Sequence, residues 1–278
     1  MTLTFFQEQS ADETRLLLEQ PGVLDTLRAA NAGIAMALID LSPQRADSIR
    51  QLNQLQIPVT AWILLPHEHG YWLTIDNAHH AQARYAQVRA WALAENLQFD
   101  GVGLDIEMPH GDAVEMVHMP LQTLVRLWWL ARHPNELKKA RHLYRELIKQ
   151  IQSDGYRTET YQFPFVLDER ALGTRILQRS LGFIDVRGDR EVLMLYKSAM
   201  PAPFGHWLVD LYGWRAQAIA IGITGGGVPS LQAAFAPRLL DLASTLREVR
   251  RARRYTRDIY VFSLEGCVEQ RMLAEVCA

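Results

Sequence analysis

The chain has 278 residues, of which 49% are hydrophobic, and its net charge is −2. This composition allows a sizeable core and excludes a disordered chain, and the near-balanced charge gives no indication of nucleic acid or an anionic membrane as a partner. No apolar run reaches the roughly 18 residues of a membrane span, and the first residues lack the basic-then-apolar pattern of a secretory signal, so we expect a cytoplasmic protein.

Apolar runs of strand length alternate with longer helical patterns, which is typical of β/α units around a parallel sheet. The first strand is expected at 3–6 (LTFF), with 183–186 as the alternative, although the latter leaves no room for a helix before the next strand. The other seven strands are expected at 33–40, 57–65, 99–106, 157–163, 191–197, 218–224 and 259–264. Because a (β/α)8 TIM-type barrel takes roughly 250 residues, the sequence predicts one such α/β domain over 1–278, with parallel inner strands.

The helical patterns fill the gaps between these strands. A helix is expected over 11–28, a second opens at Ser42-Pro43 with a Ser N-cap, and a third covers 77–96. Segment 119–153 is too long for one connection, and Pro134 is expected to split it into two helices. This helical insertion after the fourth strand is the best candidate for a lid.

The fourth strand contains the most informative residues, in the segment 99–107 (FDGVGLDIE). Because side chains alternate along a strand, Asp105 and Glu107 share one face with Gly101 and Gly103. That face is expected to line the barrel, with Glu107 at the C-terminal mouth, where such barrels keep their active sites. The alternative is that both acids only brace loops through hydrogen bonds to backbone amides.

This run resembles the fourth-strand motif of glycoside hydrolase family 18, the chitinase-like barrels, usually written DGxDxDxE. Met194-Leu195-Tyr196 resembles the Met-x-Tyr-Asp of the sixth strand in the same family. The resemblance implies that Glu107 is the general acid that protonates the glycosidic oxygen. It also implies that Asp105 orients the substrate's N-acetyl group and that Tyr196 hydrogen-bonds that acetamide.

Three positions depart from the family pattern. Gly103 stands where the first aspartate is expected, and Lys197 stands where the sixth strand has aspartate. The last strand lacks the tryptophan that usually forms the floor of the sugar-binding site. These departures concern the N-acetyl-specific mechanism rather than the barrel or the location of its site.

Aromatic and acidic residues near other strand ends could complete a sugar site, because a pyranose presents an apolar face to aromatic rings. The candidates for substrate binding are Trp62, Trp72, Glu159, Tyr161 and Glu265. Asp40, Glu159 and Glu265 are also candidates for a second catalytic carboxylate, which a two-carboxylate mechanism needs. For each aromatic residue taken alone, ordinary packing is the alternative.

Two further patterns could bind a metal ion or a phosphate group. His67 and His69 form a His-x-His pair without a fixed third ligand, so we expect no metal and no cofactor. Residues 225–227 are three glycines between the seventh strand and a helix, where barrels often bind phosphate; a tight turn is the alternative. The arginines of 247–257 fit a solvated helix face.

The leading hypothesis is a glycosidase-like hydrolase acting on a sugar linkage, with Glu107 as general acid and Asp105 as its partner. One alternative is a lyase, isomerase or transferase of a phosphorylated small molecule that uses the loop 225–227. Another is a catalytically silent barrel that binds carbohydrate or a protein. The expected partner is a small-molecule or oligosaccharide substrate, with no nucleic acid and no membrane; the oligomeric state is left open.

Overall fold

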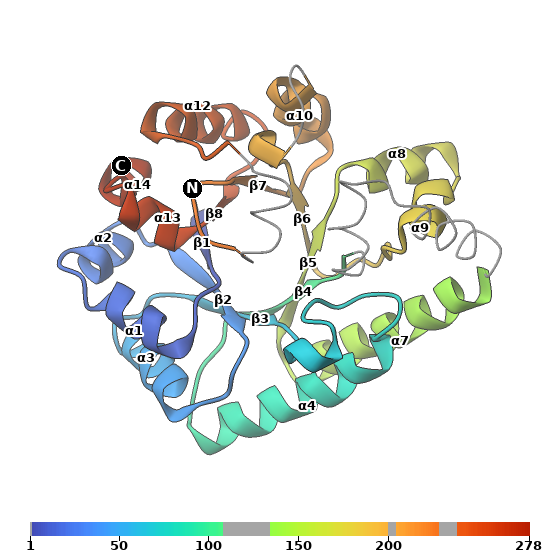
Figure 1. Ribbon diagram of the computed structural model, residues 1–278, viewed down its shortest axis with the longest axis horizontal. Coiled ribbons are helices and arrows are strands. Elements are labelled where there is room, and N and C mark those ends of the chain that lie inside the picture. The colour runs from blue at the N-terminus through green and yellow to red at the C-terminus, as the bar shows by residue number, and fades with distance from the viewer. Residues whose placement is uncertain (1, 108–133, 200–203, 228–237) are drawn as a thin grey trace.

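The computed structural model describes residues 2–107, 134–199, 204–227 and 238–278, and its eight parallel strands close into a barrel in chain order (Figure 1). The first strand pairs with both the second and the last, which completes the ring. The strands are β1 Thr2–Gln7, β2 Gly33–Leu38, β3 Val59–Ile63, β4 Gly101–Asp105, β5 Arg157–Gln162, β6 Arg190–Met194, β7 Ala218–Gly222 and β8 Asp258–Phe262. The predicted (β/α)8 barrel is confirmed, with its first strand at the start of the chain and not at 183–186.

Helices cover the outside of the barrel (Figure 1). They are α1 Ala11–Leu18, α2 Val23–Ala29, α3 Pro43–Gln54, α4 Ala78–Ala94, α7 Pro134–Ser153, α8 Phe165–Leu172, α9 Ile176–Leu181, α10 Phe204–Tyr212, α12 Leu242–Ala252, α13 Leu264–Glu269 and α14 Leu273–Cys277, with 3-10 turns η1 His67–His69, η2 Lys197–Ala199 and η3 Gly213–Arg215. The Ser42 cap is confirmed, because its side chain accepts from the amide of Arg45.

One helix over 11–28 was expected, and this prediction is wrong because α1 and α2 are separate. Pro21 has no amide hydrogen for a continuing helix, and Gly22 lies in the left-handed region with φ of 85°. The break turns the chain, so that α1 packs beside α3 while α2 packs beside α14.

Helix α7 is the ordinary barrel helix between β4 and β5, lying beside α4 (Figure 1). It begins at Pro134, where the sequence predicted a break, and buries Tyr144, Leu147 and Ile151. The rest of the expected insertion, 119–133, lies outside the described residues, as do Trp128 and Trp129. The lid therefore stays a prediction.

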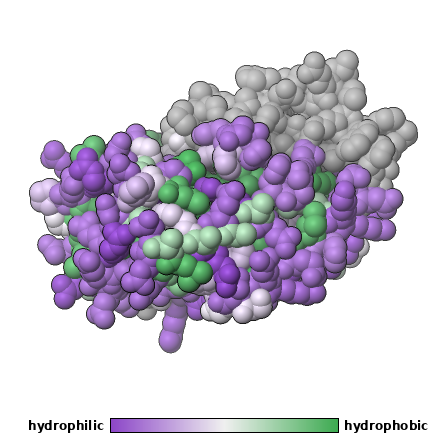
Figure 2. All heavy atoms as spheres, turned by 90° about the horizontal axis from the view of Figure 1, so that it is seen from below, coloured by the Kyte–Doolittle hydropathy of each residue, from purple (hydrophilic) through white to green (hydrophobic). Residues whose placement is uncertain are grey.

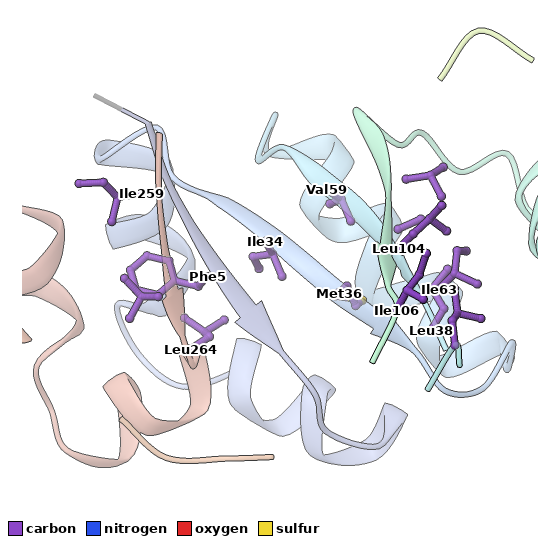
Figure 3. Close-up of a cluster of buried hydrophobic side chains, with 14 of the residues drawn as sticks. Phe5, Ile34, Met36, Leu38, Val59, Ile63, Leu104, Ile106, Ile259 and Leu264 are labelled. Atoms are coloured by element: carbon purple, nitrogen blue, oxygen red, sulfur yellow. The ribbon is translucent and has the colours of Figure 1, made fainter. Parts of the chain in front are cut away.

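The core has two parts because strand side chains alternate. Leu104 and Ile106 point outward and pack with Leu38 and Ile63 beneath the helices (Figure 3). Burying such a side chain stabilises the fold by about 1.5–3 kcal/mol. A second cluster fills the barrel interior, and there the ring of Phe6 meets the ring of Tyr161 edge-on at 4.9 Å.

The outer surface is mainly hydrophilic on the face seen from below (Figure 2). Within the described ranges, no helix is both long enough and apolar enough to cross a membrane.

Candidate active site

Four carboxyl groups gather at the C-terminal mouth of the barrel. Glu8 follows β1, Asp105 ends β4, Glu107 follows it, and Glu265 lies directly after β8 in α13. The amide of Glu8 lies 3.4 Å from Oε1 of Glu265. Burial raises the pKa of Glu8 and of Asp105, and neighbouring carboxyls raise it further, those of Glu265 and Glu107 at Glu8 and those of Glu107 and Glu8 at Asp105. The mouth is therefore strongly acidic.

Asp105 and Glu107 form a carboxyl–carboxyl pair. They lie on the same face of one strand, as predicted, and their side chains share a hydrogen bond. Burial raises the pKa of Glu107 to about 7, while burial and the neighbouring Glu107 raise the pKa of Asp105 well above its ordinary value. Two carboxylates this close cannot both ionise cheaply, so the pair holds a proton near neutral pH.

The two carboxyls of the pair differ in their exposure to solvent. Asp105 is only 4% exposed, whereas Glu107 is partly open to solvent. Burial therefore favours the protonated form of both carboxyls, and Glu107 is the more exposed member of the pair.

Glu8 is a member of this cluster that the sequence analysis missed. The hydroxyl of Tyr71 donates to its Oε1 at 2.8 Å, and burial together with Glu265 and Glu107 raises the pKa of Glu8 to about 8. The available signal was its position, one residue past the end of β1, because residues just beyond barrel strands reach the mouth.

The loop after β3 contacts both sides of the mouth. The amide of Glu107 donates to the carbonyl of Leu73 at 2.9 Å, and Leu73 forms a bridge with Ile106. Two residues earlier, the same loop presents the Tyr71 hydroxyl to Glu8. One short segment thus fixes the backbone of Glu107 and the side chain of Glu8.

Glu265, a predicted substrate-binding residue, lies against the glycine loop. It is 1% exposed, burial raises its pKa to about 7, and its Oε2 has no hydrogen-bond partner. Gly226 has φ of +69°, and a Cβ there would come within 2.7 Å of the Glu265 side chain. The glycines therefore permit close packing. Because the acidic residues Glu265 and Glu8 border the loop 225–227, this loop is an unfavourable site for an anion such as phosphate.

Tyr196 and Lys197 turn in different directions after β6. Burial and the carboxyls of Asp105, Glu107 and Glu8 raise the pKa of Tyr196, which places its phenol beside the cluster. Within the described part of the chain, no hydrogen bond from its hydroxyl to Asp105 or Glu107 is seen. Lys197 instead faces the outer layer, with Nζ 3.6 Å from the buried Glu248 of α12.

Three of the predicted aromatic residues are buried. Trp62 is 2% exposed inside the barrel and its Nε1 has no hydrogen-bond partner. Tyr161 also lies inside, where its ring occupies the space next to Gly103. Trp72, 5% exposed, packs at the edge of the same interior cluster. These residues form the floor and wall beneath the acids rather than an open platform.

The other candidate acids have structural partners. Glu159 pairs in register with Gly103 rather than Asp105, and Arg190 lies 3.6 Å from its carboxylate, so it sits one layer below the mouth. Asp40 pairs with Arg45 at 2.9 Å and accepts from Ser42 in the following helix cap. Neither joins the cluster at the mouth.

No group of three or more potential ligands is arranged for a metal ion among the residues that the structure describes. His67 and His69 are exposed, and the ring of His69 stacks on that of His80 at 4.2 Å.

Solved structures of other proteins share this fold over nearly the whole chain. No family model and no curated protein sequence matches it. The glycoside hydrolase domain of PgaB (BpsB) from Bordetella bronchiseptica aligns over 100% of this chain and 98% of its own, with a TM-score of 0.53 and 8% identity. A chitinase from Chromobacterium violaceum aligns over 98% of each chain, with a TM-score of 0.52 and 16% identity. The GH18 chitinase ChiB of Flavobacterium johnsoniae covers 99% of this chain and 92% of its own, with a TM-score of 0.53 and 11% identity. At these identities the likeness concerns the fold.

Proposed function

We propose that the protein is a glycosidase-like hydrolase that cleaves a sugar linkage, with Glu107 as general acid and Asp105 as its partner. The observation that carries this proposal is the hydrogen-bonded pair at the mouth, in which burial raises the pKa of Glu107 to about 7. A general acid works best when its pKa lies near the working pH, because it then holds a proton and still gives it up readily.

The sequence resemblance and the fold support the same reaction class. Asp105 and Glu107 match the last two acids of the chitinase-like motif on the matching strand, and Tyr196 lies beside them from β6. Solved structures with this fold include two chitinases and a glycoside hydrolase domain. The proposed substrate is therefore an oligosaccharide.

The departures from the motif bear on the second catalytic group. Gly103 has no acid to support an acetamide-orienting aspartate, and Lys197 faces away from the mouth. Glu8 and Glu265, on the side of the barrel opposite β4, are available as the second carboxylate of a two-acid mechanism. Such a mechanism does not need an N-acetyl group on the substrate.

The test is turnover of a panel of short oligosaccharides, measured by release of reducing ends. Glu107→Gln keeps the shape of the side chain but cannot donate a proton, so we expect kcat to fall roughly 10²- to 10⁴-fold. Glu68→Gln, in the exposed turn η1, is the matched control and should retain activity. Unchanged turnover in Glu107→Gln would exclude this role for Glu107.

The silent carbohydrate-binding barrel remains the second candidate, favoured by the missing acid at Gly103. It predicts saturable binding of an oligosaccharide with no turnover by the unaltered protein. Binding with turnover that depends on Glu107 excludes it.

A further inference from the structure

Glu8 and Glu265 form a second acidic pair, across the mouth from Asp105 and Glu107. β1 and β8 are neighbours in the barrel, and β4 lies on the opposite side of the ring. The amide of Glu8 lies 3.4 Å from Oε1 of Glu265, so the two residues are in direct contact through the backbone of one and the side chain of the other. Gly226 lies against the side chain of Glu265, and a Cβ on Gly227 would lie 3.7 Å from Oε2 of Glu8.

This pair lacks a balancing positive charge among the described residues. No lysine or arginine in those ranges forms an ion pair with either carboxyl. Lys197 forms its ion pair with Glu248, and Arg190 forms ion pairs with Glu159 and Asp258. Oε2 of Glu265 is buried without a hydrogen-bond partner, and so is Oδ1 of Asp105 across the mouth. A buried acceptor without a donor costs about 1–3 kcal/mol, so these oxygens indicate that a donor group arrives with the ligand.

We propose that the Glu8–Glu265 pair binds the free ammonium group of an amino sugar. The inference rests on the proposed function, and it adds that the substrate has unacetylated amino groups. An ammonium offers three donors and a positive charge, which match two carboxylates and the unpartnered Oε2 of Glu265.

Neutral sugar substituents fit the same place less well. A hydroxyl can donate one hydrogen bond but brings no positive charge that would favour ionisation of the pair. An acetamide has one N–H and a carbonyl oxygen, and that oxygen would face carboxylates. The chemistry of the pair therefore selects the amine over its acetylated form.

Binding of an ammonium should be coupled to proton release. Burial and the neighbouring acids raise the pKa of Glu8 to about 8, so Glu8 keeps a proton at neutral pH when no ligand is bound. A bound positive charge favours the ionised carboxylate, and the proton of Glu8 leaves to solvent as the ammonium binds. No bond other than this O–H bond is broken in the step.

The experiment is calorimetric titration with three tetramers of equal length, built of glucosamine, N-acetylglucosamine or glucose. Titrations of the unaltered protein and of Glu107→Gln at pH 7, each in two buffers of different ionisation enthalpy, give both affinity and protons released. We expect the glucosamine tetramer to bind at least tenfold more tightly than either other tetramer, with net proton release. Equal or tighter binding of the acetylated or the glucose tetramer would overturn the inference.

Two variants locate the effect. Glu265→Gln and Glu8→Gln should each remove most of the preference for the glucosamine tetramer, while Glu68→Gln should keep it. A preference that survives in both Gln variants would place the amine elsewhere and overturn the assignment. Failure of the proposed function is distinguishable, because it appears as turnover that persists in Glu107→Gln, whatever the tetramers show in binding.

Discussion

Tyr161 occupies the space that a side chain on Gly103 would need. The two residues belong to neighbouring strands, and the phenol ring carbon Cζ lies 2.7 Å from the position of a Cβ at residue 103, with the hydroxyl oxygen closer still. Where the chitinase-like motif has an aspartate, this chain has Gly103 on β4. The ring of Tyr161 on β5 fills the space beside it. Asp105 then sits above an aromatic ring instead of a second acid.

This relationship predicts strong coupling between the two positions. Gly103→Ala should lower the free energy of unfolding by about 1–3 kcal/mol, because a methyl group there overlaps a rigid, fully buried ring. In a Tyr161→Ala background the same change should cost almost nothing, since the ring is gone. Urea unfolding of the two single variants and the double variant measures the coupling. Equal losses in both backgrounds would show that Tyr161 does not fill this space.

The acidic mouth should make stability fall as pH rises. The pKa of Glu8 is about 8 in the folded protein, above its ordinary value of 4.5. A raised pKa means that the folded state binds the proton more tightly. The stabilisation that comes from the proton on Glu8 is therefore complete below about pH 4.5 and is lost as pH rises toward 8. Glu8→Gln should consequently be more stable than the unaltered protein at pH 8, by on the order of 2–4 kcal/mol, and closer to it at pH 5.

The control for this prediction is Glu13→Gln. Hydrogen bonds from Ser10 lower the pKa of Glu13, so its stabilisation is present above its ordinary pKa and is lost as pH falls. Glu13→Gln should thus destabilise the protein at neutral pH, opposite in sign to Glu8→Gln. Chemical unfolding at pH 5 and pH 8 compares the two. If Glu8→Gln destabilised the protein at pH 8, the buried-acid account of the mouth would be wrong.

Lys197 should affect stability without affecting turnover. Its Nζ lies 3.6 Å from Glu248, which is also paired with Arg251 at 3.4 Å, so Lys197→Met should cost about 1 kcal/mol and leave kcat/KM unchanged. Lys197→Asp restores the residue type of the motif but places a negative charge beside Glu248. It should therefore cost more stability than Lys197→Met and bring no gain in activity. An increase in turnover in Lys197→Asp would show that this side chain reaches the mouth.

The sequence predicted the barrel well because most strands are short apolar runs that alternate with helical patterns. It also placed Asp105 and Glu107 on one face, since alternation along a strand is a local property. It did not predict that Glu8 joins them, because only closure of β1 against β8 brings residue 8 beside residue 265. Nor could it show that Trp62 and Tyr161 are buried, which depends on the space left by Gly103 on the strand between them.

The central claim is that a proton held at the Asp105–Glu107 pair drives cleavage, and the pH dependence of kcat/KM on the best-cleaved oligosaccharide tests it most directly. With the pKa of Glu107 at about 7, the acid is lost as pH rises, so kcat/KM should fall above pH 7 with a slope of one proton. This decrease of kcat/KM above pH 7 should be absent in Glu107→Gln, which should keep only a slow residual rate. A kcat/KM that stays at its full value to pH 9, or a decrease near pH 7 that persists in Glu107→Gln, would contradict the account.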